Sequence, residues 1–236
     1  MSEEKLTIVV GHSGSGKSEF VAGYALYLKN HGGYPVIADL DIVNPYFRLR
    51  ELKEYFKSQD IRVISSNYED DYHMDMPALA ASLQTCFTSD GKDGIVNIVD
   101  VGGDPSGAHV LARYAESLRN KTYNMWIVVN ANRPQTANAE SAAACIAAIE
   151  NASRLKINGL INSTHMLKET SVDDILKGNK LIEQLSKITG IPVVYTLMEE
   201  KFEKETENIQ LSGKRFIVKP LMQINVMERL IRKDRE

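Results

Sequence analysis

The sequence has few of the features that mark secreted, disulfide-bonded or membrane-spanning proteins. It holds two cysteines, Cys86 and Cys145, far apart and in helix-like segments, and we interpret them as buried thiols. No apolar run approaches the roughly 18 residues of a membrane span. The first five residues, Met-Ser-Glu-Glu-Lys, are acidic where a secretory signal peptide needs basic residues. We therefore expect a cytoplasmic protein with no membrane partner.

Neither sign of charge dominates the chain. It has 28 Lys and Arg against 31 Asp and Glu, a net charge of −3, so no strong field attracts nucleic acid. With 236 residues and 43% apolar content, the chain is long enough for one substantial core. It shows no internal repeat, low-complexity tract or linker. We expect residues 1–236 to form a single domain.

Short apolar runs alternate with helix-period segments along the chain. The predicted strands are 6–10, 35–39, 61–64, 95–100, 124–129, 157–162, 192–197 and 216–219. The predicted helices are 17–31, 48–58, 77–88, 106–118, 136–153, 172–189 and 222–233, with Ser171 and Asp174 typical of a helix N-cap. This alternation predicts an α/β fold with a doubly wound, mostly parallel sheet flanked by helices.

The strongest single motif follows the first predicted strand. Residues 11–18 read Gly-His-Ser-Gly-Ser-Gly-Lys-Ser, a full match to the P-loop pattern G-x-x-x-x-G-K-[ST], and a predicted helix follows them. Glycines let the backbone wrap around phosphates, Lys17 would bridge β- and γ-phosphate oxygens, and Ser18 would ligate Mg²⁺. The predicted nucleotide contacts here are Gly11, His12, Ser13, Gly14, Ser15, Gly16, Lys17, Ser18 and Glu19.

Acidic residues end two further predicted strands. Asp39 and Asp41 would lie on the same side if the second strand continues through both, one near Mg²⁺ and the other orienting a water. Asp100 ends the apolar strand 95–100, as in a Walker B motif, and would bind Mg²⁺ directly or through water. Gly102 and Gly103 follow it, and a backbone N–H there would approach the γ-phosphate and sense its loss.

These residues resemble the signal-recognition/MinD/BioD (SIMIBI) class of P-loop NTPases, and within it the CobQ/CobB/MinD/ParA-like ATPases. The resemblance rests on Asp-Leu-Asp-Ile-Val-Asn at 39–44, on Asp-Val-Gly-Gly at 100–103 and on asparagines at two later strand ends. It implies that Asp41 positions or activates the attacking water and that Asp39 and Asp100 support Mg²⁺. It also implies that Asn162 reads the nucleobase, with Asn130, Asn132 and Arg133 nearby.

One position departs from the MinD/ParA pattern. Those ATPases carry a signature lysine after the first P-loop glycine, which reaches the partner's nucleotide across a dimer, and this chain has His12 there. The substitution puts a nucleotide-sandwich homodimer in question. It also brings the chain nearer to metallochaperone GTPases, although no Cys-His pair or His-rich tract is present. We interpret His31, His73, His109 and His165 as surface or helix residues.

The sequence favours ATP over GTP. Residues 162–165 read Asn-Ser-Thr-His, which lacks the lysine and aspartate of the guanine-reading N-K-x-D element. Two loops, 42–48 with Tyr46, Phe47 and Arg48, and 65–76, would cover the nucleotide or bind a partner, or they are ordinary surface loops.

The predicted function is a Mg²⁺-dependent ATPase that acts as a nucleotide-driven switch, alone or coupled to a protein partner. One alternative is a small-molecule kinase or an ATP-dependent ligase of the dethiobiotin synthetase type, with Tyr46, Arg48 and Asp104 near the acceptor. Others are a metallochaperone-type GTPase and a nucleotide-binding scaffold without hydrolysis.

Overall fold

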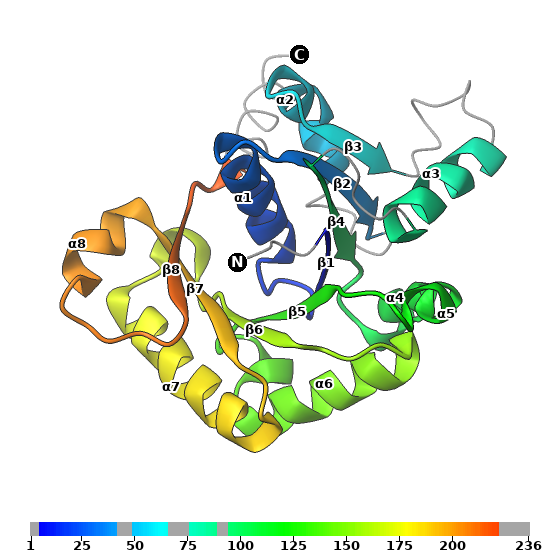
Figure 1. The fold of residues 1–236 in the computed structure, drawn as a ribbon. Helices are drawn as coiled ribbons and strands as arrows, with labels where there is room; N and C mark the ends of the chain where they lie inside the picture. The colour runs from blue at the N-terminus through cyan, green and yellow to red at the C-terminus, as the bar shows by residue number, and fades with distance from the viewer. Residues whose placement is uncertain (1–4, 42–48, 66–75, 89–93, 222–236) are drawn as a thin grey trace, which may run out of the picture.

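The computed structural model describes residues 5–41, 49–65, 76–88 and 94–221 (Figure 1). The predicted helix 222–233, loop 42–48 and nearly all of loop 65–76 lie outside these residues. The strands are β1 Leu6–Val10, β2 Tyr34–Leu40, β3 Arg62–Ser65, β4 Ile95–Val101, β5 Asn124–Val129, β6 Gly159–Asn162, β7 Val193–Glu199 and β8 Lys214–Val218.

The α-helices are α1 Lys17–Asn30, α2 Lys53–Ser58, α3 Met76–Thr88, α4 Pro105–Ala108, α5 Ala115–Leu118, α6 Ala139–Ser153, α7 Val172–Thr189 and α8 Glu203–Thr206. Short 3₁₀ segments are η1 Leu49–Leu52, η3 His109–Arg113, η4 Pro134–Thr136, η5 Leu167–Glu169 and η6 Glu200–Phe202. Among the described residues, no helix is both long and apolar enough to cross a membrane.

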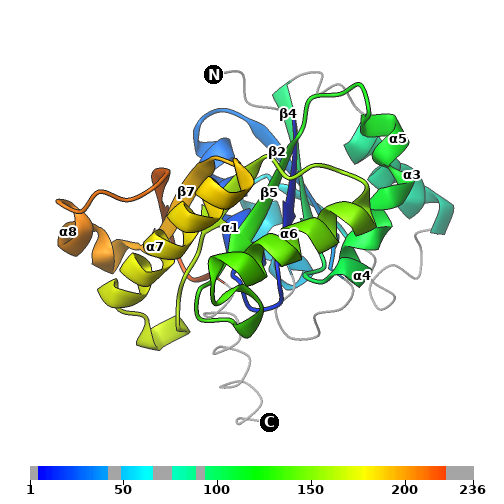
Figure 2. The same cartoon turned by 90° about the horizontal axis from the view of Figure 1, so that it is seen from below.

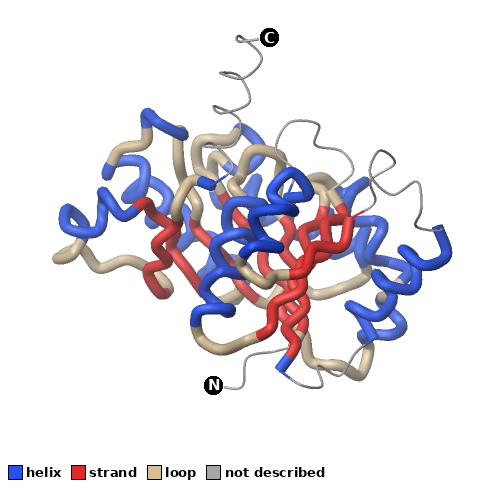
Figure 3. The backbone as a smooth tube through the Cα atoms, turned by 90° about the horizontal axis from the view of Figure 1, so that it is seen from above, coloured by secondary structure: helices blue, strands red, loops and turns tan. Residues whose placement is uncertain are grey.

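The eight strands of the described residues form one sheet in the order β3-β2-β4-β1-β5-β6-β7-β8, and every neighbouring pair is parallel. Strand β1 therefore lies between β4 and β5, and the chain winds outward from it in both directions. In open parallel sheets the carboxyl ends of the strands at such a switch point form the ligand crevice. Figure 3 shows the strands running through the middle of the molecule between the helices.

Both faces of the sheet are covered, which explains why its strands are apolar on both sides. One buried cluster joins the sheet to α3, to the α4–α5 segment, to α6 and to α7, and Figure 2 shows α6 and α7 side by side. The other joins it to α1 and α2. The predicted fold class, a single α/β domain with a doubly wound parallel sheet, is confirmed.

Local sequence signals place the long helices well. Helix α7 begins after Ser171, whose hydroxyl accepts from the N–H of Asp174 while the Asp174 carboxylate accepts from the N–H of Ser171, so the predicted cap is confirmed. Helix α6 begins at Ala139 rather than 136, because Asn138 forms a capping box with Ser141.

The predicted helix over 106–118 is wrong in detail. The segment consists of α4, η3 and α5, and the Asp104 carboxylate accepts the N–H of Gly107 at 2.7 Å to start it. A Cβ on Gly107 would come within 2.7 Å of the Gly102 backbone, so the chain turns back on itself here. The change to a 3₁₀-helix at His109 then divides the segment into short helical pieces where periodicity alone predicts a continuous helix.

We expect Gly159→Ala to destabilise the fold. Gly159 of β6 pairs with Trp126 of β5, and a Cβ would come within 2.3 Å of the indole and 2.6 Å of Val194. Overpacking of this kind costs about 1–3 kcal/mol. Urea unfolding followed by the fluorescence of Trp126, the single tryptophan, measures the change. An unchanged midpoint would contradict this prediction, because it would show that the added methyl group is accommodated without loss of stability.

Candidate phosphate and nucleoside site

The P-loop connects the end of β1 to the first residue of α1. Its backbone is left-handed at Gly11, Gly14 and Gly16, with φ of 140°, 75° and 92°. A Cβ on Gly11 would lie 2.4 Å from the Val128 carbonyl oxygen, so the loop also needs glycine to pass β5. Gly16 is the N-cap of α1 and has no side chain with which to cap it. The positive end of α1 therefore opens into the loop, which suits an anion.

Two consecutive residues of α1 connect the loop to acidic strand ends. Lys17 is 4% exposed, and its Nζ lies 3.6 Å from Oδ2 of Asp41. The Ser18 hydroxyl donates to Oδ2 of Asp100 over 2.7 Å. The structure thus brings together the predicted phosphate-binding lysine and the predicted Mg²⁺ residues from three separate segments.

The sheet register places the predicted acids side by side. Asp39 on β2 pairs with Asp100 on β4, and Asp41 follows just beyond β2. The strand does not continue through both aspartates, because the N–H of Asp41 turns back to Oδ1 of Asp39 at 3.0 Å. All three carboxyl groups are nevertheless buried, at 1–3% exposure.

Burial raises the pKa of Asp100 to about 7. Lys17 and the hydrogen bond from Ser18 lower this pKa, while the charges of Asp39 and Asp41 raise it. Such a site favours a proton or a cation beside the carboxyl group.

The donor set fits a magnesium ion that is shared with phosphate. Oδ1 of Asp100 is buried and has no hydrogen-bond partner among the described residues. Within those residues no three His, Cys, Asp or Glu side chains cluster closely enough to hold a metal ion by themselves. Mg²⁺ usually takes only one or two carboxylates and completes its shell with phosphate oxygens and water. Ser18 and Asp100 meet that requirement, with Asp39 beside them.

The segment after β4 packs directly on the P-loop. A Cβ on Gly103 would lie 2.5 Å from the Gly11 carbonyl oxygen and 2.6 Å from the Ser13 nitrogen. Only glycine fits this approach, and it places the backbone of Gly103 against the part of the loop that precedes the phosphate-binding lysine.

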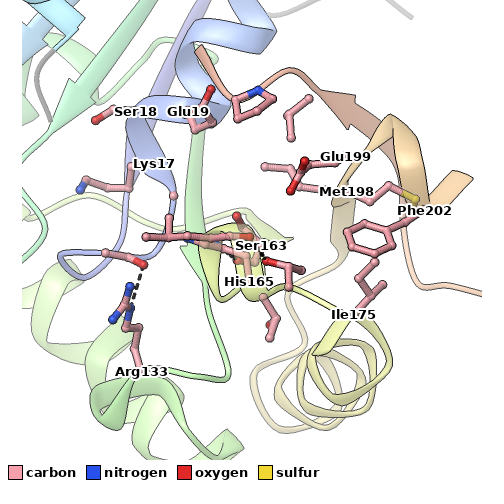
Figure 4. A pocket seen from close by; sticks show the side chains of 18 of the residues that line it. Lys17, Ser18, Glu19, Arg133, Ser163, His165, Ile175, Met198, Glu199 and Phe202 are labelled. Carbon is pink, nitrogen blue, oxygen red and sulfur yellow. Dashed lines mark hydrogen bonds between the residues drawn. The ribbon is translucent and has the colours of Figure 1, made fainter. Parts of the chain in front are cut away.

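A cavity of about 300 Å³ continues from the P-loop toward β7 and β8 (Figure 4). Residues 13, 14 and 16–19 form its phosphate end. Its apolar walls are Leu167, Ile175, Leu197, Met198, Phe202, Val218 and Pro220. The size and the apolar lining with a few polar groups are typical of a small-ligand site.

Side chains from the β5–α6 connection hold the outside of the P-loop. Nδ2 of Asn130 and Nε of Arg133 both donate to the Gly14 carbonyl oxygen, at 3.3 and 3.0 Å. Asn130 also donates to the His165 carbonyl oxygen at 3.2 Å. Arg133 lines the cavity, whereas Asn130 supports the loop from behind.

The structure does not bring Asn162 to the cavity. Its Oδ1 accepts from the backbone N–H and the hydroxyl of Thr164, and Gly178 of α7 lies against it. Its Nδ2 is buried and has no hydrogen-bond partner among the described residues. The predicted base-reading role of Asn162 stays a prediction that these contacts do not favour.

Two ionisable cavity residues were not assigned to the site from the sequence. His165, expected on a surface or helix, lies in the β6–α7 connection and lines the cavity; burial lowers its pKa. Glu199, the last residue of β7, lines the opposite wall. Neither belongs to a motif, and the only signal was their place just after a predicted strand.

We expect the free energy of unfolding of the nucleotide-free, metal-free protein to fall as pH rises from about 4 to about 7. In this window Asp100 is protonated when folded but ionised when unfolded, because its pKa changes from about 7 to 3.8. Asp100→Asn should make the free energy of unfolding less dependent on pH in this window and raise it at pH 8 by about 1–3 kcal/mol.

Chemical denaturation in a chelating buffer across this pH range measures the effect. Asp60→Asn is the matched control, since Asp60 is exposed and its hydrogen bond with Lys29 lowers its pKa. If the free energy of unfolding of Asp100→Asn fell with pH as steeply as that of the wild type, Asp100 would not be the cause of the pH dependence.

Comparison with protein-family models and with curated proteins finds no match to the chain. Solved structures of the signal recognition particle receptor FtsY match it. FtsY from Elizabethkingia anophelis is 18% identical over 90% of this chain and 63% of its own, with a TM-score of 0.56. Its complex with GDP is 17% identical over 83% and 58%, with a TM-score of 0.53. Chloroplast FtsY from Physcomitrella patens is 15% identical over 83% and 59%, with a TM-score of 0.56.

The chain spans about three fifths of the length of these receptors. At this identity the likeness concerns the fold. The neighbours represent the signal-recognition members of the predicted class, and nothing in them singles out the MinD/ParA-like family. The chain has the P-loop NTPase fold that FtsY also has.

Proposed function

We propose that this protein is a Mg²⁺-dependent nucleoside triphosphate hydrolase that works as a nucleotide-driven switch. The observation that carries the proposal is the meeting of Lys17, Ser18 and Asp100 at the open N-terminus of α1, with a cavity leading away from it. We also take residues 1–236 as one domain, because Leu221 at the end of the described chain donates to Glu19 of α1.

Each residue has a distinct part in this proposal. The N–H groups of the P-loop and of the α1 N-terminus bind the phosphates, and Lys17 neutralises the β- and γ-oxygens. Ser18, Asp100 and Asp39 hold Mg²⁺, which supplies charge neutralisation across the phosphates when bound. Asp41 orients the attacking water. Hydrolysis needs no covalent step from the protein, so positioning and charge account for the rate.

The proposed switch rests on competition for the Lys17 side chain. Lys17 pairs with Asp41 at 3.6 Å, and a γ-phosphate competes for the same lysine. Binding therefore releases Asp41 from this pair and draws Gly103, which already packs on Gly11 and Ser13, toward the phosphate. Loss of the γ-phosphate reverses both changes.

His12 bears on the proposed partner. Its Nδ1 lies 3.2 Å from the Ser13 carbonyl oxygen, so in this structure the side chain turns toward its own loop. This contact supports a switch coupled to a different protein partner over a sandwich homodimer. The kinase and ligase alternative has less support, since the Asp104 carboxylate caps α4. Tyr46 and Arg48, which were predicted near the acceptor, lie outside the described residues.

We expect phosphate release from ATP or GTP with Mg²⁺ to be slow, and Lys17→Ala to reduce it by about 10²–10³-fold. The lysine provides the one side-chain cation that α1 directs at the phosphates. Lys29→Ala is the matched control, because Lys29 lies at the other end of α1 and pairs with Asp60. Undiminished turnover in Lys17→Ala would exclude this site as the origin of the activity.

We expect Asp41→Asn to keep nucleotide affinity and to lose about 10²–10⁴-fold in turnover, because the amide no longer accepts the water's proton. Single-turnover hydrolysis and equilibrium binding of a non-hydrolysable triphosphate separate the two effects. A parallel loss of binding and turnover would assign Asp41 to binding instead.

A further inference from the structure

Glu199 is a carboxylate that lines a largely apolar cavity, and the proposed function has not used it. We propose that Glu199 reads the nucleobase and that the site takes guanine nucleotides. The inference rests on the proposed function, because it treats the cavity beside the P-loop as the nucleoside site. It reverses the preference for ATP that the missing N-K-x-D element indicates.

Glu199 differs from the other carboxylate that lines the cavity. Glu19 lies on α1 next to Ser18, and its Oε1 accepts the N–H of Leu221 at 2.6 Å. The one partner of Glu199 among the described residues is Lys201, at 3.2 Å, whose side chain is 48% exposed. An exposed pair of this kind is weak. Glu199 can therefore accept hydrogen bonds from a ligand. Glu19 instead binds the backbone at Leu221, next to Pro220, which lines the cavity.

His165 contributes a second acceptor. Its Nδ1 lies 2.7 Å from the Ser163 carbonyl oxygen, which can only accept, so Nδ1 carries the proton. Burial lowers the pKa of His165, the ring is neutral, and Nε2 is left as an acceptor. The charge of Glu199 opposes this effect of burial, since it raises the pKa of His165. Figure 4 shows them on facing walls of the cavity.

The chemistry of the two purines decides which one suits these acceptors. Guanine carries adjacent N1–H and N2 amino donors, and a carboxylate accepts from both. Adenine offers its N6 amino group beside the lone pair of N1, which repels a carboxylate. Because both guanine donors can pair with the Glu199 carboxylate and the adenine N1 lone pair repels it, the site favours guanine.

The sheet topology explains how a carboxylate on a different strand can contact the base. Strands β6 and β7 are neighbours, with Asn162 paired to Thr196, so their carboxyl ends open on the same cavity. In N-K-x-D the carboxylate follows the equivalent of β6, where this chain has His165. Here Glu199 supplies it from the end of β7.

The test is calorimetric titration of the full chain with four nucleotides in the presence of Mg²⁺. They are GDP, ADP, inosine diphosphate (IDP) and xanthosine diphosphate (XDP). Wild type should bind GDP at least about tenfold more tightly than ADP, with IDP between them because inosine keeps N1–H but lacks the N2 amine. Glu199→Gln should weaken GDP binding by at least about tenfold, leave ADP binding unchanged or stronger, and gain XDP binding. The gain is expected because a glutamine amide both accepts from xanthine N1–H and donates to its O2.

Glu200→Gln is the matched control, since the neighbouring Glu200 is exposed and does not line the cavity, and it should bind all four as wild type does. Equal affinity for GDP and ADP, or equal losses for both in Glu199→Gln, would overturn the role of Glu199 and leave the proposed function standing. Failure of wild type to bind any of the four would overturn both.

Discussion

The burial of three carboxyl groups around Lys17 is the constraint on which the rest of the site depends. Asp39, Asp41 and Asp100 are nearly inaccessible to water, and Lys17 is as deeply buried as they are. Burial is the main cause of the raised pKa of Asp100, and the charges of Asp39 and Asp41 raise it further. A proton, Lys17 and the Ser18 hydroxyl each offset the cost of burying the Asp100 charge. In the proposed function, Mg²⁺ takes the place of the proton.

The parallel sheet creates this constraint. Because β4 lies between β1 and β2, the Walker B aspartate comes beside the P-loop on one side and beside Asp39 on the other. The P-loop, the end of β2 and the end of β4 are far apart in the sequence, and only the sheet brings them together. The apolar layers on both faces hold the strands in this register, so packing far from the site sets the distances within it.

Hydrogen bonds connect the phosphate loop to the wall of the cavity. The Gly14 carbonyl oxygen accepts from Asn130 and Arg133, and Asn130 reaches on to the backbone of His165, which lines the cavity. A base bound against His165 would therefore bear on the same peptide that shapes the P-loop.

The sequence alone determined what local chemistry decides. The P-loop, the eight strands, the cap of α7 and the acidic ends of β2 and β4 are each encoded within a few consecutive residues, so their identity could be predicted. The division of the predicted helix 106–118 into α4, η3 and α5 was missed, because hydrophobic periodicity does not mark a change from α-helical to 3₁₀ hydrogen bonding. Only the tertiary structure decided which side chains share the cavity. Asn162 turns toward α7 while His165 and Glu199 face the open space, because strand register and helix packing act between residues far apart in the chain.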